Sequence, residues 1–214
     1  MPQQNSSAPP DVRRADSTAV HVAQWYVPGR AAGVEALDDA ARQWRAAAWP
    51  AGILSAGAYL STDGDTVLTY VQTAGPGAHR AFTAGLDGLA GAATVEYTLH
   101  HAIVLEPGAP TPASFVVAGF DVDGPGPQRR IVEAITGALE RAPAGQHPGM
   151  ISANFHLSTD GTRVLNYAEW TSDEAHQAFL DGATRTATLR ATHETPGVRP
   201  IGFKRYHLRH GITA

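Results

Sequence analysis

The pentapeptide LSTDG occurs twice in this chain, at Leu60–Gly64 and at Leu157–Gly161. The similarity continues beyond it, because VLTY at Val67–Tyr70 corresponds to VLNY at Val164–Tyr167 with the same offset of 97 residues. The Asp-Gly pair supplies the positive φ that a tight hairpin turn needs, so each copy is predicted to join two strands here. A repeat of about a hundred residues has the ordinary size of a small domain. The chain therefore reads as two copies of one unit.

Each copy is predicted to contain four strands and two helices in the order β-α-β-β-α-β. The helical period is clearest in the second copy, at Ile131, Val132, Ile135 and Leu139. In the first copy we expect strands over residues 19–27, 53–60, 66–72 and 94–105, and helices over 34–47 and 77–86. In the second copy we expect strands over residues 114–122, 150–157, 163–170 and 201–208, and helices over 128–141 and 173–189.

This order is the split-βαβ, ferredoxin-like plan of α+β proteins, whose sheet has helices on one face only. Two such sheets in one chain can bury their bare faces against each other, so we expect an intrachain pseudo-dimer with a barrel-like core. The expected division is a disordered arm over residues 1–17, a first domain over 18–105, a Pro-rich linker over 106–112 and a second domain over 113–210.

Composition excludes several classes of function. The chain has 214 residues, 43% of them hydrophobic, with a formal net charge of −4 and a pI near 6.2. Without a basic surplus, nucleic acid is not an expected partner. The absence of cysteine excludes disulfides and thiolate metal sites and fits a cytoplasmic protein. The apolar runs are too short to cross a membrane.

The stretch Val164–Phe179, VLNYAEWTSDEAHQAF, reads as a strand that leads into a helix. Ser172 and the acidic residues after it are typical of a helix N-terminus. Asn166 and Trp170 lie four residues apart on the strand, so both point to one face. If that face is buried, the amide and the indole N–H each need a partner. Either a bound substrate or the protein core can supply these partners.

The pattern STDG, then V-x-N-Y-A-x-W and S-x-E-A, resembles the antibiotic biosynthesis monooxygenase family. The pattern is most similar to that of the cofactor-independent anthrone monooxygenases of aromatic polyketide biosynthesis. The resemblance is stronger in the second copy. The resemblance implies a dimeric α+β barrel fold. It also implies a pocket lined by an Asn, a Trp, a Tyr and an Arg.

Carried onto this sequence, the resemblance places the Asn at Asn166, the Trp at Trp170 and the Arg at Arg190. The Tyr position holds His176, a departure from the family pattern that leaves His176 as the candidate proton shuttle. Further candidates for substrate contact are Asn154, Phe155, His156, Tyr167 and Phe179. Arg190 could instead serve the helix C-terminus alone.

The first copy lacks these groups. Its equivalents are Thr69 for Asn166 and Thr73 for Trp170, while His79 corresponds to His176. We expect a structural half whose own pocket is degenerate.

The resemblance implies oxygenation of an anthrone-type phenol to a quinone by dioxygen, without a metal or a prosthetic group. The expected partners are a small aromatic molecule and dioxygen, with the chain acting as a monomeric pseudo-dimer or as a homodimer. Two alternatives stay open: a ring-opening oxygenase that uses reduced FMN or FAD as a cosubstrate, and a non-catalytic module that binds an aromatic ligand. A metal site is not expected, because the neighbours His100 and His101 point to opposite faces of a strand and no carboxylates accompany His207 and His210.

Overall fold

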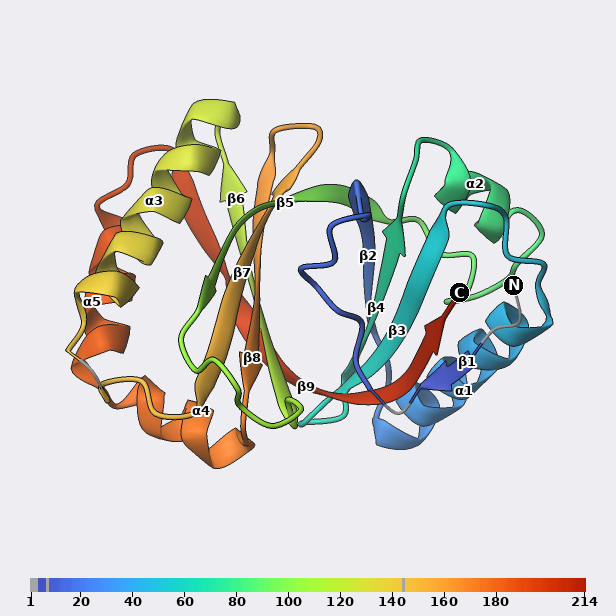
Figure 1. The fold of residues 1–214 in the computed structure, drawn as a ribbon, viewed down its shortest axis with the longest axis horizontal. Coiled ribbons are helices and arrows are strands. Elements are labelled where there is room, and N and C mark those ends of the chain that lie inside the picture. Colours follow the sequence, from blue (N-terminus) through green and yellow to red (C-terminus); the bar gives the residue numbers. More distant parts are fainter. Residues whose placement is uncertain (1–3, 7, 144) are drawn as a thin grey trace. The chain divides into compact units, whose positions relative to one another are not determined.

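The computed structural model describes residues 4–6, 8–143 and 145–214, and the chain forms two compact units (Figure 1). Unit 1 runs to Thr98 and resumes over Tyr206–Ala214, and unit 2 spans Leu99–Arg205. Both units have the ferredoxin-like α+β order that the repeat predicts.

In unit 1 the antiparallel sheet follows the order β1-β9-β3-β4-β2-β5. Its elements are β1 (Gln4–Ser6), β2 (Ala19–Tyr26), α1 (Arg30–Ala46), β3 (Ile53–Ser61), β4 (Thr66–Thr73), α2 (Ala78–Thr83) and the start of β5 (Val95–Val104).

In unit 2 the sheet follows the order β5-β7-β8-β6, and β9 also pairs with β6. Helices cover one face of this sheet (Figure 1). The elements are β6 (Ser114–Val122), α3 (Pro125–Arg141), β7 (Met150–Ser158), β8 (Arg163–Trp170), α4 (Asp173–Leu180), α5 (Ala183–His193) and the start of β9 (Val198–Thr213).

The unit boundaries fall inside the fourth strand of each repeat, not at the predicted linker over residues 106–112. Residues 95–97 of β5 pair with β2 in unit 1, and the strand continues into unit 2 from Leu99. The last part of β9, from Tyr206, belongs to unit 1 and pairs there with β3. Each of these two strands therefore contributes residues to both units. The sheet-to-sheet packing of the two copies stays a prediction.

The core of unit 2 lies between α3 and the sheet. Ile131, Val132 and Leu139 are buried on the helix, as their spacing predicts, and they share one apolar cluster with Phe155 and Val164. Burying a side chain of this size contributes about 1.5–3 kcal/mol. The hairpin between β7 and β8 is also as predicted, because Gly161 has a φ of 78° and donates its N–H to the Ser158 carbonyl.

Part of the segment over residues 1–17, which the sequence predicts to be a disordered arm, is held against unit 1. Val12 is only 2% exposed, and the Asp11 carbonyl accepts a hydrogen bond of 2.8 Å from the buried Gln72 amide. Residues 4–6 form β1 beside β9. The buried Val12 and the Gln72 amide therefore hold a segment whose composition is that of a loop. Residues 1–3 and 7 of the predicted arm lie outside the described residues.

The single helix expected over residues 173–189 is two helices. The first ends at Leu180 and the second begins at Ala183, with Gly182 between them donating its N–H to the Phe179 carbonyl. Glycine favours a break because it loses more backbone entropy in a helix than any other residue. The break sets a new rotational register for α5, which decides which of its side chains face the interior.

We predict that Ser172→Ala lowers the free energy of unfolding by about 1 kcal/mol. The Ser172 hydroxyl accepts a hydrogen bond of 3.2 Å from the Ala175 N–H and so caps α4. Urea unfolding should show this loss, and Ser172→Asp, which keeps an acceptor at the cap, should retain most of the stability. Equal losses in both variants would contradict a capping role.

Candidate functional site

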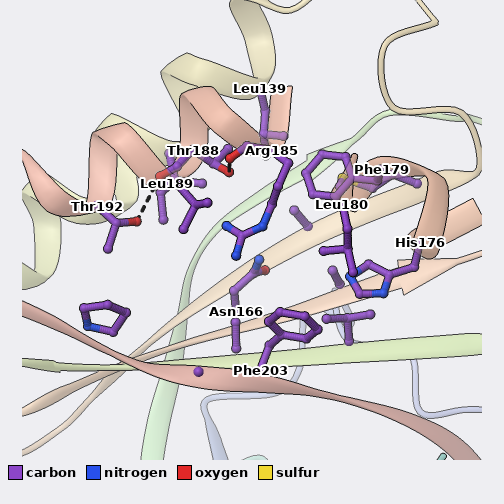
Figure 2. A pocket seen from close by; sticks show the side chains of 18 of the residues that line it. Leu139, Asn166, His176, Phe179, Leu180, Arg185, Thr188, Leu189, Thr192 and Phe203 are labelled. Atoms are coloured by element: carbon purple, nitrogen blue, oxygen red, sulfur yellow. Dashed lines mark hydrogen bonds between the residues drawn. The ribbon is translucent and has the colours of Figure 1, made fainter. Parts of the chain in front are cut away.

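A cavity of about 780 Å³, counting the open space at its mouth, lies in unit 2 between the sheet and helices α3 to α5 (Figure 2). Its walls are mainly apolar and include Val116, Ile135, Phe179, Leu180 and Phe203. Pockets of this size and character bind small organic ligands in many proteins. The few polar groups among these walls therefore decide what the cavity can hold.

Two of these polar groups come from β8. Asn166 and Trp170 both line the cavity, as the alternation of side chains along the strand predicts. Within the described part of the chain, neither Asn166 Oδ1 nor Trp170 Nε1 has a hydrogen-bond partner, although both atoms are buried. Each buried polar atom without a hydrogen bond lowers the stability of the folded protein by about 1–3 kcal/mol. Because both residues line the cavity, a molecule that enters it can bond to both atoms.

The third polar group is Arg185, from the first turn of α5. Figure 2 shows its guanidinium turned into the cavity towards the Asn166 amide. The side chain is half-buried, and its guanidinium carbon lies 5.9 Å from the centre of the Phe203 ring. Burial lowers the pKa of Arg185, and no carboxylate among the described residues forms an ion pair with it. The cavity therefore contains a positive charge that a ligand can neutralise.

The predicted arginine, Arg190, does not line this cavity. It is exposed on α5, and at 3.6 residues per turn it lies roughly 140° around the helix from Arg185. The helix break accounts for these positions, since α5 begins at Ala183 with its own register and turns Arg185 inward. Because the position of the break is not evident from the sequence, sequence reasoning could not choose between Arg185 and Arg190.

His176 closes one side of the cavity and is 3% exposed. Its ring lies 5.0 Å from Trp170 and 5.4 Å from Phe203, both edge to face. Burial, together with the positive charges of Arg205 and Arg185, lowers the pKa of His176 to about 4, against a smaller opposing effect of Asp173. The imidazole is therefore neutral near pH 7.

Arg205 contacts one nitrogen of that neutral ring. Its Nε and one terminal nitrogen donate to His176 Nδ1 at 3.2 Å and 3.1 Å. A guanidinium has donors and no acceptor, so this contact favours a lone pair on Nδ1 over an N–H group there. Sequence reasoning missed Arg205 because only the fold brings β9 beside α4.

Four of the other predicted contacts lie elsewhere. Asn154 donates to the Ser152 hydroxyl at 2.8 Å and to the Tyr167 carbonyl at 2.9 Å, within a buried polar network. His156 is fully buried and its Nδ1 lies 3.1 Å from the Asn154 carbonyl. Asn154, His156 and Tyr167 alternate with cavity-facing residues and so point to the opposite face of the sheet. Phe155 is core.

Phe179 does line the cavity, together with Asn166, Trp170 and His176. The structure therefore brings together four of the nine predicted residues, and it adds Arg185, Arg205 and Phe203.

In the first copy the equivalent positions are packed differently. Thr69 and Thr73 are buried on β4, and His79 stacks on His21 with ring centres 4.0 Å apart. Trp49 packs edge to face on Phe82, 5.3 Å away. Unit 1 therefore has two buried threonines where the second copy presents the Asn166 amide and the Trp170 indole to a cavity.

Residues 116–193 match the sequence profile of the antibiotic biosynthesis monooxygenase family. Over 92 residues, the chain is 32% identical to the tetracenomycin-F1 monooxygenase of Streptomyces glaucescens; the aligned region covers 43% of this chain and 70% of that enzyme. The chain belongs to the antibiotic biosynthesis monooxygenase family.

Solved structures of low sequence identity share the fold. A protein described as anthrone oxidase-like has a TM-score of 0.72 at 16% identity, covering 92% of this chain and 93% of its own. A monooxygenase-like protein from Lactobacillus acidophilus NCFM has a TM-score of 0.54 at 14% identity, covering 89% and 94%.

No helix in residues 4–6, 8–143 and 145–214 is both long enough and apolar enough to cross a membrane. Within the same ranges no three His, Asp or Glu side chains converge as metal ligands would.

We predict that Asn166→Leu leaves the free energy of unfolding unchanged or raises it by about 1 kcal/mol, because it removes a buried acceptor that has no partner. Asn154→Leu is the matched control and should cost about 1–3 kcal/mol, since its amide is satisfied. Urea unfolding measures both. A marked loss of stability in Asn166→Leu would show that its amide is paired in the folded protein.

The pH dependence of stability tests the burial of His156. Burial lowers the pKa of His156 to about 4, below its ordinary value of 6.5, so the unfolded chain binds more protons between these values. Stability is therefore lost as the pH falls from 6.5 towards 4, with a slope of about 1.4 kcal/mol per pH unit for each such histidine. His156→Gln should reduce the slope between pH 6.5 and 5 by that amount. Parallel curves for the two proteins would contradict a neutral buried imidazole.

Proposed function

We propose that unit 2 oxygenates a flat polycyclic phenol of the anthrone type with dioxygen, giving the quinone without a metal or a prosthetic group. The observation that carries this proposal is an apolar cavity with one guanidinium and two buried polar atoms that have no partner among the described residues. Family membership supports it, as does a relative named tetracenomycin-F1 monooxygenase.

The cavity suits a flat aromatic molecule with oxygen substituents. Trp170, Phe179 and Phe203 provide aromatic surface, and the aliphatic walls exclude water from the rings. Asn166 Oδ1 can accept a hydrogen bond from a phenol hydroxyl, while Arg185 can donate two to a carbonyl or phenolate oxygen.

Arg185 drives the first chemical step. Loss of a proton from the reactive CH₂ of an anthrone gives an anion whose charge is delocalised onto the carbonyl oxygen. A guanidinium close to that oxygen favours the anion, and in an apolar cavity its effect is stronger than in water. The proton leaves to solvent at the open mouth of the cavity.

The anion then reacts with dioxygen. One electron passes from the anion to dioxygen, and the resulting carbon radical and superoxide combine to form a C–O bond. The peroxide gains one proton. Loss of the remaining C–H proton together with O–O cleavage then releases water and leaves a C=O group. In sum, CH₂ and O₂ give C=O and H₂O, and no external reductant is consumed.

His176 and Trp170 act on the peroxide as donors. The neutral His176 ring has its proton on Nε2, so it offers a hydrogen bond and not the basic site expected of a proton shuttle. Trp170 Nε1 offers a second N–H. Donors placed where negative charge develops are among the strongest catalytic devices that a protein has.

The test is turnover of dithranol by protein freed of metal with a chelator and checked for flavin by absorbance, first without and then with oxygen. We expect oxygen-dependent quinone formation that falls by about 10²-fold in Arg185→Gln, a typical loss for one stabilising donor. Trp170→Phe should also be slower. Arg190→Gln, on the outer side of the same helix, should stay within about twofold of the wild type, because exposed substitutions away from a site have small effects.

Two outcomes would contradict the proposal. Turnover that requires added reduced FMN would show flavin-assisted oxygenation. Binding of the phenol, detected by quenching of tryptophan fluorescence, without turnover under either condition would show an aromatic-binding module.

A further inference from the structure

Arg205 is held in place by several contacts within unit 2. Besides its two hydrogen bonds to His176, it donates to the Gln177 side-chain oxygen at 3.4 Å and lies 4.0 Å from the Asp173 carboxylate. The Arg205 side chain is 19% exposed. It does not line the cavity itself, so any effect it has on bound substrate passes through His176.

The contact is selective between the two forms of a neutral imidazole. If the proton were on Nδ1, it would face a guanidinium that has only N–H groups to offer, and two hydrogen bonds would be replaced by a repulsive contact. If the proton is on Nε2, the lone pair of Nδ1 accepts both donors. Partners at one ring nitrogen of a histidine determine the protonation of the other in the same way at metal and catalytic sites.

We propose that Arg205 is a positioning residue that holds His176 in the Nε2–H form and so makes it a hydrogen-bond donor to the oxygen intermediate in the cavity. This inference rests on the proposed function for the identity of that oxygen. The form of the His176 ring is independent of it.

The surroundings of His176 reinforce this state. Two positive groups, Arg205 and Arg185, face the ring, and Asp173 is the negative group near it. Trp170 and Phe203 exclude water from it. Protonation would place a third positive charge beside two arginines in an apolar setting, so the ring remains a neutral donor over the range in which most enzymes work.

The test uses ¹⁵N-histidine NMR of the full chain without substrate, because protonated and unprotonated ring nitrogens differ in chemical shift. The signals of His176 are those missing in His176→Asn. In the wild type we expect an unprotonated Nδ1 and a protonated Nε2. Arg205→Gln, whose amide can accept as well as donate, should populate the Nδ1–H form. It should also move protonation of the ring to higher pH, because a positive charge is lost.

Turnover of dithranol gives the functional readout. Arg205→Gln should be slower by about tenfold, less than the loss of a whole donor, because part of the population keeps the productive form. Arg205→Lys, which is also a donor without an acceptor, should restore the Nε2–H signal and most of the rate. Arg199→Gln on the same strand, whose partner is the exposed Asp123, is the control and should match the wild type.

The inference is overturned if wild-type His176 has its proton on Nδ1, or if Arg205→Gln changes neither the ring signals nor their pH dependence. Circular dichroism checks that the variants fold, and Arg205→Lys provides a second variant that retains the charge. Failure of dithranol oxidation with the expected NMR result would refute the proposed function alone, so the two ideas fail separately.

Discussion

Arg185 points into the apolar cavity of unit 2, and no carboxylate among the described residues neutralises it. The chemistry of the site follows from that one charge. An unpaired guanidinium in such a place is costly to the folded protein unless a ligand completes it. Burial lowers the pKa of His176, and the charges of Arg205 and Arg185 add to this effect, so the site holds a cation and a neutral donor. The anion of a flat phenol can neutralise the Arg185 cation and accept a hydrogen bond from the His176 donor.

The fold provides this arrangement through local backbone events. Strand alternation on β8 sends Asn166 and Trp170 to the helix-covered face of the sheet. Gly182 ends one helix and lets the next begin with Arg185 turned inward. The buried polar network of Asn154 on the other face shows the contrast, since there each amide group has partners. Unpaired polar atoms therefore lower stability on the helix-covered face of the sheet, whereas the polar groups on the opposite face are paired.

Much of this is predictable from the sequence. The repeat, the hairpin at Gly161 and the apolar period of α3 all follow from local rules, and the structure has them. Four of the predicted pocket residues also line the cavity. Arg185 was not predictable because its orientation depends on a helix break, and Arg205 was not because its contact is with a residue 29 positions away in the sequence. The burial of Val12 was not predictable, because composition does not reveal a single buried anchor.

The most direct measurement is a spectrophotometric titration of 1,8-dihydroxyanthraquinone, a product-like phenol whose colour changes on ionisation, bound to the wild type and to Arg185→Gln. An unpaired cation close to the phenol oxygen should lower the pKa of the bound phenol by about 1–3 units. The Arg185→Gln protein should lose most of that shift. A bound phenol whose pKa is unchanged or raised in the wild type would contradict the central claim that the cavity is built to hold an aromatic anion.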